Sequence, residues 1–174
     1  MIRLAHASYG VASLLIPASA LPAFTVVHVA ISLAAIVSGF IVVFGMIADR
    51  RLAGWTAFFL ATTVATSVTG FGFPVSGMTP GIAFGLISLV VLAAVIDARY
   101  LRQLAGAWRK VYVIGSVFAF YLNFVVLIVQ SFQKLAPLHA LAPNQNEPPF
   151  LAVQIVSLVA FLVLGTLSVK RFRA

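Results

Sequence analysis

The sequence predicts an all-α integral membrane protein, a helical bundle of five transmembrane helices preceded by an N-terminal peripheral or signal-like segment. Two observations carry this prediction: five apolar stretches alternate with polar joints, and the positive charges gather in the joints of one side. Hydrophobic residues make up 63% of the 174-residue chain and charged residues only 8%. Because no internal repeat or low-complexity linker is visible, we expect one transmembrane domain over residues 24–174, after a segment over residues 1–23.

The apolar stretches have the length that a bilayer requires, since its hydrocarbon core takes roughly 20 helical residues. The predicted spans cover residues 24–48, 55–73, 81–96, 111–132 and 150–169. The third span is short unless its helix continues to Tyr100. Asp97 and Arg99 would then lie at the headgroups, where long charged side chains reach water.

The distribution of Lys and Arg predicts the orientation, because basic residues in short joints are enriched on the cytoplasmic side. If the five spans alternate, nine basic residues share one side, against Lys134 alone or Lys134 with Arg3. The nine are Arg50, Arg51, Arg99, Arg102, Arg109, Lys110, Lys170, Arg171 and Arg173. We therefore expect a cytoplasmic C-terminus, with residues 74–80 and 134–149 outside. The net charge of +8 is then topological, and anionic lipid headgroups are its expected partner instead of nucleic acid.

Residues 1–23 leave three alternatives open. Arg3, an apolar run over residues 11–16 and small residues at 18–20 resemble a secretory signal with cleavage after Ala20. The same segment is also compatible with a retained interfacial helix, or with a sixth, poorly apolar span.

Polar side chains within the spans mark the candidate site, because lipid offers them no water. Residues on one face of the fourth span repeat at helical spacing: Tyr112, Ser116, Ala119, Asn123, Gln130 and Lys134. Hydroxyl groups follow two neighbouring rows of the second span, Thr62, Thr66 and Thr69 beside Thr63, Ser67 and Gly70. Such hydroxyls are able to bond back to their own helix.

Depth suggests that several of these residues meet. His28 and Gln154 each lie about 6 Å inside the outer end of a span, with Thr69 and Gln130 at similar height. The possible ligand or polar cluster comprises His28, Thr66, Thr69, Asn123, Gln130, Gln154 and Glu147, with residues 144–147 as its lid. Two interpretations remain open: a structural seam in which amides hydrogen-bond between helices, or an apolar cleft for a quinone-like or lipid-like molecule.

The sequence predicts no catalytic residue, no cofactor and no metal site. There is no cysteine, no His-Glu-x-x-His helix and no phosphate-binding loop. A bis-histidine haem is disfavoured, since of the three histidines only His28 falls within a span. The carboxylates Asp49, Asp97 and Glu147 fall at span ends or in a joint, which argues against the usual proton relay of a transporter.

Several short runs resemble a group of small, uncharacterised multi-pass bacterial inner-membrane proteins. The runs are Trp108-Arg109-Lys110, Tyr121-Leu122-Asn123, and residues 129–134 and 141–150. The resemblance implies a bacterial inner (cytoplasmic) membrane location. It carries over no functional residue, because the group has no established activity.

Three functions follow as hypotheses. The first is a non-catalytic interaction or accessory subunit of a larger membrane complex or homo-oligomer, embedded in the lipid bilayer. The second is a binding protein for a quinone-like or lipid-like molecule, and the third a small solute carrier.

Overall fold

The chain forms a bundle of helices without a strand, in a computed structural model that describes residues 18–74 and 78–173. A short 3₁₀ turn, η2 (Ala18–Ala20), leads into α1 (Leu21–Ile47). The other bundle helices are α2 (Ala53–Gly70), α3 (Pro80–Ile96), α4 (Trp108–Lys134) and α6 (Pro148–Arg171). A single wide turn, η3 (Asp97–Leu101), extends α3, and the short α5 (Ala136–Leu141) joins α4 to α6.

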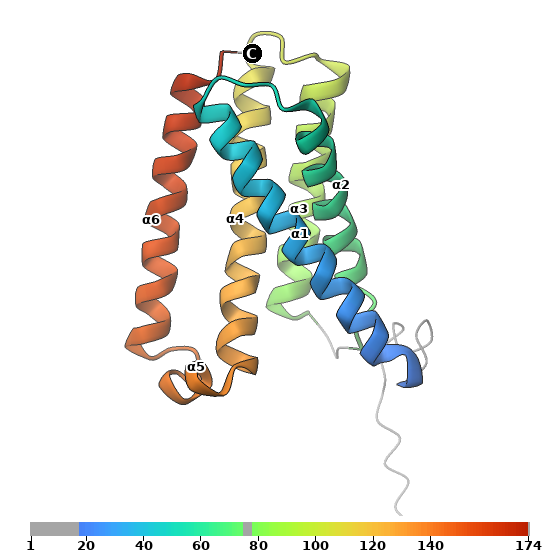
Figure 1. The fold of residues 1–174 in the computed structure, drawn as a ribbon, viewed down its shortest axis with the longest axis vertical. Coiled ribbons are helices and arrows are strands. Elements are labelled where there is room, and N and C mark those ends of the chain that lie inside the picture. Colours follow the sequence, from blue (N-terminus) through green and yellow to red (C-terminus); the bar gives the residue numbers. More distant parts are fainter. Residues whose placement is uncertain (1–17, 75–77, 174) are drawn as a thin grey trace, which may run out of the picture.

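Successive long helices run in opposite directions along the bundle (Figure 1). α1 contacts α2, α4 and α6, and α3 packs between α2 and α4. Because α4 also contacts α2 and α6, it touches every other long helix. We call the end with residues 48–52, 97–110 and 170–173 the basic end, and the end with residues 70–74, 78–80 and 134–148 the loop end. α1 crosses the bundle obliquely, so that its first turns lie beside the C-terminal end of α2 and away from α5 (Figure 1).

Four helical segments are long and apolar enough to cross a membrane: Leu21–Ile47, Pro80–Leu101, Trp108–Lys134 and Pro148–Arg171. They correspond to the first, third, fourth and fifth predicted spans. The helix of the third predicted span includes the expected extension past Ile96. α2, the remaining predicted span, is not among them. Its 18 residues include five threonines and a serine, whose hydroxyls lower its mean hydropathy. Predictions that concern residues 1–17, the cleavage signal included, lie outside the described residues.

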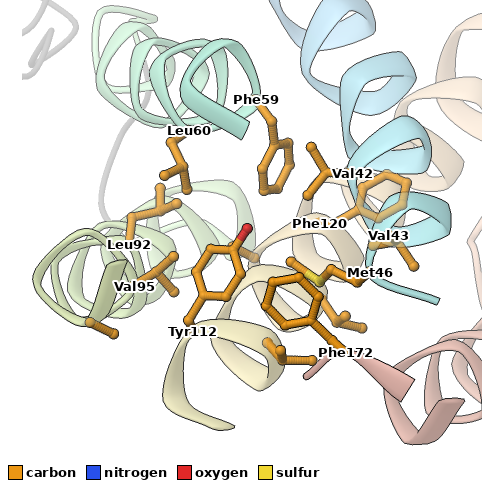
Figure 2. Close-up of a cluster of buried hydrophobic side chains, with 14 of the residues drawn as sticks. Val42, Val43, Met46, Phe59, Leu60, Leu92, Val95, Tyr112, Phe120 and Phe172 are labelled. Carbon is orange, nitrogen blue, oxygen red and sulfur yellow. The ribbon is translucent and has the colours of Figure 1, made fainter. Parts of the chain in front are cut away.

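Aromatic and aliphatic side chains fill the bundle between the helices. Phe120 on α4 is fully buried, and its ring packs edge-on against Phe40 and Phe161, at centroid distances of 4.8 and 4.9 Å. Towards the basic end, Figure 2 shows Tyr112 surrounded by side chains of α1, α2, α3 and the C-terminal tail. All five long helices and the C-terminal tail therefore share one core.

Two glycines allow unusually close contact with neighbouring helices. An added Cβ at Gly39 would lie 2.7 Å from the ring of Phe120, and one at Gly115 would lie 2.4 Å from Cγ2 of Val95. Small residues commonly allow such approach in membrane bundles, where helices gain from packing because lipid is as apolar as their side chains. The α1–α4 and α3–α4 contacts depend on these positions.

The connection from α3 to α4 at the basic end has a defined backbone structure. The wide turn after α3 is closed by the Arg102 N–H bonding the Asp97 carbonyl at 2.9 Å, and Arg102 also pairs with the Asp97 carboxylate at 3.3 Å. Gln103, Leu104 and Gly106 then take positive φ values, which reverse the chain towards α4. The chain therefore turns within a few residues, as antiparallel packing of α3 and α4 requires.

Candidate functional site

The first polar contact at the loop end joins α1 to α2. His28 Nδ1 lies 2.7 Å from the Thr69 hydroxyl oxygen. That hydroxyl has a second short contact, 2.7 Å to the carbonyl of Ala65 one turn earlier. Because a carbonyl only accepts, the Thr69 proton points to Ala65 and the imidazole is the donor. In the neutral imidazole this arrangement places the proton on Nδ1 and leaves Nε2 as an acceptor.

Aromatic rings flank this histidine. Phe73, just after α2, meets the imidazole edge-on at 5.0 Å and meets Phe24 at the same distance. A Cβ on Gly70 would lie 3.8 Å from Cε1 of His28, so α2 leaves room for the ring without a clash. His28, Thr69 and Phe73 thus lock the oblique start of α1 onto the end of α2.

The second polar group surrounds Glu147, directly before α6. One carboxylate oxygen accepts the backbone N–H and the side-chain amide of Asn144, both at 3.0 Å, and the other accepts the N–H of Asn146 at 3.1 Å. Partial desolvation, which by itself would raise the pKa of Glu147, is outweighed by these bonds to Asn144 and Asn146. The pKa therefore lies below its usual value. Glu147 holds the turn as a carboxylate.

The loop is also tied to the end of α4. Gln145 donates to the carbonyl of Val129 at 2.8 Å, and its own amide oxygen accepts from Gln133 at 3.4 Å. Ala142 is fully buried and Phe150 nearly so, in a small apolar cluster with Phe132. Residues 135–149 are consequently a structured connection, with a short helix followed by a hydrogen-bonded turn.

The seven predicted cluster residues fall into separate parts of the bundle. His28 and Thr69 are in direct contact between α1 and α2, at the corner of the loop end beside the C-terminal end of α2. Glu147 belongs to the α4–α5–α6 corner, where Gln130 is exposed and Gln154 half-buried (Figure 1). The hydrogen bonds found do not link the two corners, so a common cleft beneath the loop stays a prediction.

Thr66 and Asn123 belong to a third set, of buried polar atoms that lack a hydrogen-bond partner among the described residues. The set is Thr63 Oγ1, Thr66 Oγ1, Ser88 Oγ, Ser116 Oγ, Asn123 Nδ2 and Ser168 Oγ. Buried polar groups normally have partners, and one left without costs about 1–3 kcal/mol. These atoms on α2, α3, α4 and α6 therefore each leave a hydrogen-bonding capacity unused inside the bundle.

Most other hydroxyl groups in the helices bond to their own backbone. Thr62, Ser67 and Thr69 each donate to a carbonyl one turn earlier, at 2.7–3.0 Å. Ser32, Ser131 and Ser157 do the same in α1, α4 and α6. The expectation that hydroxyls bond back to their own helix is thus confirmed for these residues.

Sequence reasoning missed one interaction at the basic end. The Arg109 guanidinium donates to the carbonyl of Val169 at 3.1 Å and also to that of Phe172. The Phe172 ring is buried against Tyr112, and the next N–H, of Arg173, donates to Asp49 at 2.7 Å. Arg109 was counted only as a topological charge, and an arginine in a basic joint carries no signal that separates the two roles.

Comparisons with known protein families, with curated proteins and with solved structures give no match to this chain. Within the described ranges, there is also no group of three or more His, Cys, Asp or Glu side chains arranged to hold a metal ion. The polar side chains described above can donate and accept hydrogen bonds at the loop end and in the bundle interior.

Proposed function

We propose that this is a five-span protein of the bacterial inner membrane with a cytoplasmic C-terminus, acting as a non-catalytic accessory subunit of a membrane complex. The basic end, with nine Lys and Arg residues, would face the cytoplasm. α2 would be the fifth span, because it runs antiparallel between α1 and α3 and its 18 residues rise about 27 Å. Its exposed flank carries Trp55, Phe58 and Val68, side chains suited to lipid.

The observation that supports an accessory role best is the shallow attachment of α6. In its most apolar window only 17% of the residues are buried, against 50% in α4. The buried residues of α6 form one narrow stripe: Phe150, Ser157, Phe161 and Ser168. Two further faces of the helix remain uncovered by the rest of the chain.

The uncovered surface of α6 is continuous and mostly apolar. Its large exposed residues are Leu151, Val153, Ile155, Val156, Leu158, Val159, Leu162 and Val163. A shallow groove of about 270 Å³ lies among Val159, Leu162, Val163, Thr166 and Leu167. Thr166 donates to its own helix at Leu162, so the groove needs no polar partner. A transmembrane helix of another subunit would pack here as it would against any apolar ridge.

A small-molecule binding protein is the second candidate. The unpartnered atoms of Thr66 and Asn123, together with the Nε2 lone pair of His28, favour it, since a quinone-like or lipid-like headgroup would supply the missing hydrogen bonds. A small solute carrier is the third, and it would use the same buried polar positions.

Native mass spectrometry of gently extracted protein discriminates between these functions. The accessory role predicts a second polypeptide at fixed stoichiometry, lost when Val159 and Val163 are both changed to Trp. The matched control is Val90→Trp on α3, a position that is more open, at 67% exposure against 54% and 53% for Val159 and Val163, and it should keep the partner. A bare monomer contradicts the accessory role, and a retained non-protein molecule supports the second candidate.

Accessibility labelling of single cysteines tests the orientation, because the natural chain has none. Labels at Ala53 and near Arg173 should react only from the cytoplasmic side, and a label at Asn144 only from outside. If the labels at residues 53 and 144 react from the same side, α2 does not cross the membrane.

A further inference from the structure

A shallow apolar groove at the start of α2 lies directly beside a pair of arginines. Gly54, Trp55 and Phe58 line it, and its volume is about 370 Å³. Trp55 and Phe58 are about half exposed and meet edge-on at 6.2 Å, while a Cβ on Gly54 would meet nothing within 4 Å. Gly54 therefore leaves open space beside the Trp55 and Phe58 side chains.

The joint that carries the arginines is held by backbone hydrogen bonds. The backbone N–H of Arg50 donates to the carbonyl of Gly45 at 2.8 Å. The backbone N–H groups of Leu52 and Ala53 donate to the carbonyls of Arg50 and Arg51, respectively. The Leu52 side chain also packs onto Gly45, where an added Cβ would lie only 2.6 Å away. Arg50 and Arg51 thus project, exposed, from a backbone of fixed shape.

Positive charge dominates around this joint. Asp49 is the carboxylate next to Arg50 in the sequence, and its Oδ1 accepts the backbone N–H of Arg173. That bond brings the basic tail residues Lys170, Arg171 and Arg173 to the same end of the bundle, while no ion pair to Arg50 or Arg51 is found among the described residues. A diffuse anion-attracting surface therefore surrounds the mouth of the apolar groove.

We infer that an anionic phospholipid binds at the start of α2, with its phosphate headgroup on Arg50 and Arg51 and an acyl chain in the Gly54–Trp55–Phe58 groove. A lipid combines a negative headgroup with an apolar chain, in the same order in which the arginines and the groove follow one another along the surface. Tryptophan also concentrates where headgroups meet hydrocarbon. This site is separate from the α6 surface, so it stands or falls independently of the accessory role.

The test uses the full-length protein in nanodiscs of equimolar phosphatidylglycerol and phosphatidylcholine, followed by native mass spectrometry of the lipids retained after release. The wild type should retain phosphatidylglycerol in preference to phosphatidylcholine. Arg50→Gln with Arg51→Gln should lower that preference roughly tenfold, because each basic residue at the surface contributes to the attraction. Arg50→Lys with Arg51→Lys should keep most of it.

Gly54→Leu tests the groove without altering charge, and should reduce the number of retained lipids by filling the space between Trp55 and Phe58. Ala61→Leu, also on the exposed flank of α2 but outside the groove, is its matched control and should change nothing. Lys110→Gln removes one exposed charge elsewhere at the basic end. If Lys110→Gln lowers the preference as much as the double Arg variant, or the wild type shows no preference, the site does not exist.

Discussion

Replacing Gly115 by alanine is the most direct test of the α3–α4 packing. The new Cβ would lie 2.4 Å from Cγ2 of Val95 and 3.5 Å from Cγ1 of Val91. Ordinary contact begins at 3.4 Å, so the first distance is about 1 Å too short, whereas the second is acceptable. Val95 is fully buried and cannot turn aside freely. Overpacking of this kind costs about 1–3 kcal/mol of unfolding free energy.

A double-mutant cycle identifies the contact responsible. Val95→Ala removes the two γ-carbons and, by itself, should destabilise the bundle by roughly 1–3 kcal/mol, because buried methyl groups are lost and a cavity remains. In the double variant the alanine at position 115 occupies part of that space, and the clash is gone. We expect its destabilisation to fall short of the sum of the single variants by about 1–2 kcal/mol.

The measurement is reversible unfolding in mixed micelles with increasing denaturing detergent. Gly165→Ala, inside α6, is the matched control, since its Cβ would lie at an ordinary 3.4 Å from Val117 and it reports mainly the gain in helix propensity from losing a glycine. Single and double variants whose effects add within about 0.5 kcal/mol would refute the argument, because uncoupled residues are not in contact.

The remaining predictions concern polar groups. Arg109→Gln should weaken unfolding stability by about 1–2 kcal/mol and expose the Phe172 tail to protease, with Arg109→Lys intermediate, because charged donors to carbonyls are lost. Asn123→Leu should be neutral or stabilising if its buried Nδ2 has no partner, and a loss of about 1 kcal/mol would instead indicate a bridging amide or bound water. Because the pKa of Glu147 is lowered on folding, its contribution is fully present above its unfolded pKa near 4.5 and is lost as pH falls through the lower folded value. Hydrogen exchange of residues 144–147 should therefore accelerate on acidification in the wild type, and Glu147→Gln should show fast exchange without this dependence.

The helices could be predicted from sequence because apolar length is a local property. α6, for example, extends only two residues beyond each end of its predicted span. α2 was predicted on the same ground, but its threonines interrupt its apolar run, so length and composition alone do not assign it to a membrane. The pairing of His28 with Thr69 was within reach, because shared depth limits the partners.

Lateral position could not be predicted, because depth along a helix says nothing about its tilt. α1 crosses the bundle obliquely and carries His28 towards the C-terminal end of α2, whereas Gln154 remains on α6 (Figure 1). The close contact between Gly39 and the ring of Phe120 places the middle of α1 against α4. A glycine in an apolar run does not reveal which ring will cover it.

The same contacts bear on what the polar seam does. Helices in lipid gain no hydrophobic free energy from meeting one another, so packing or interhelical hydrogen bonds must hold them. Here the close contacts are apolar, at Gly39 and Gly115, while hydroxyls such as Ser67 satisfy themselves within their own helix. His28 and Thr69 are an exception, as is the Thr56 hydroxyl facing Tyr112 at 3.4 Å. Few interhelical hydrogen bonds therefore join the seam residues, and unpartnered groups such as Asn123 Nδ2 carry a desolvation cost of about 1–3 kcal/mol each.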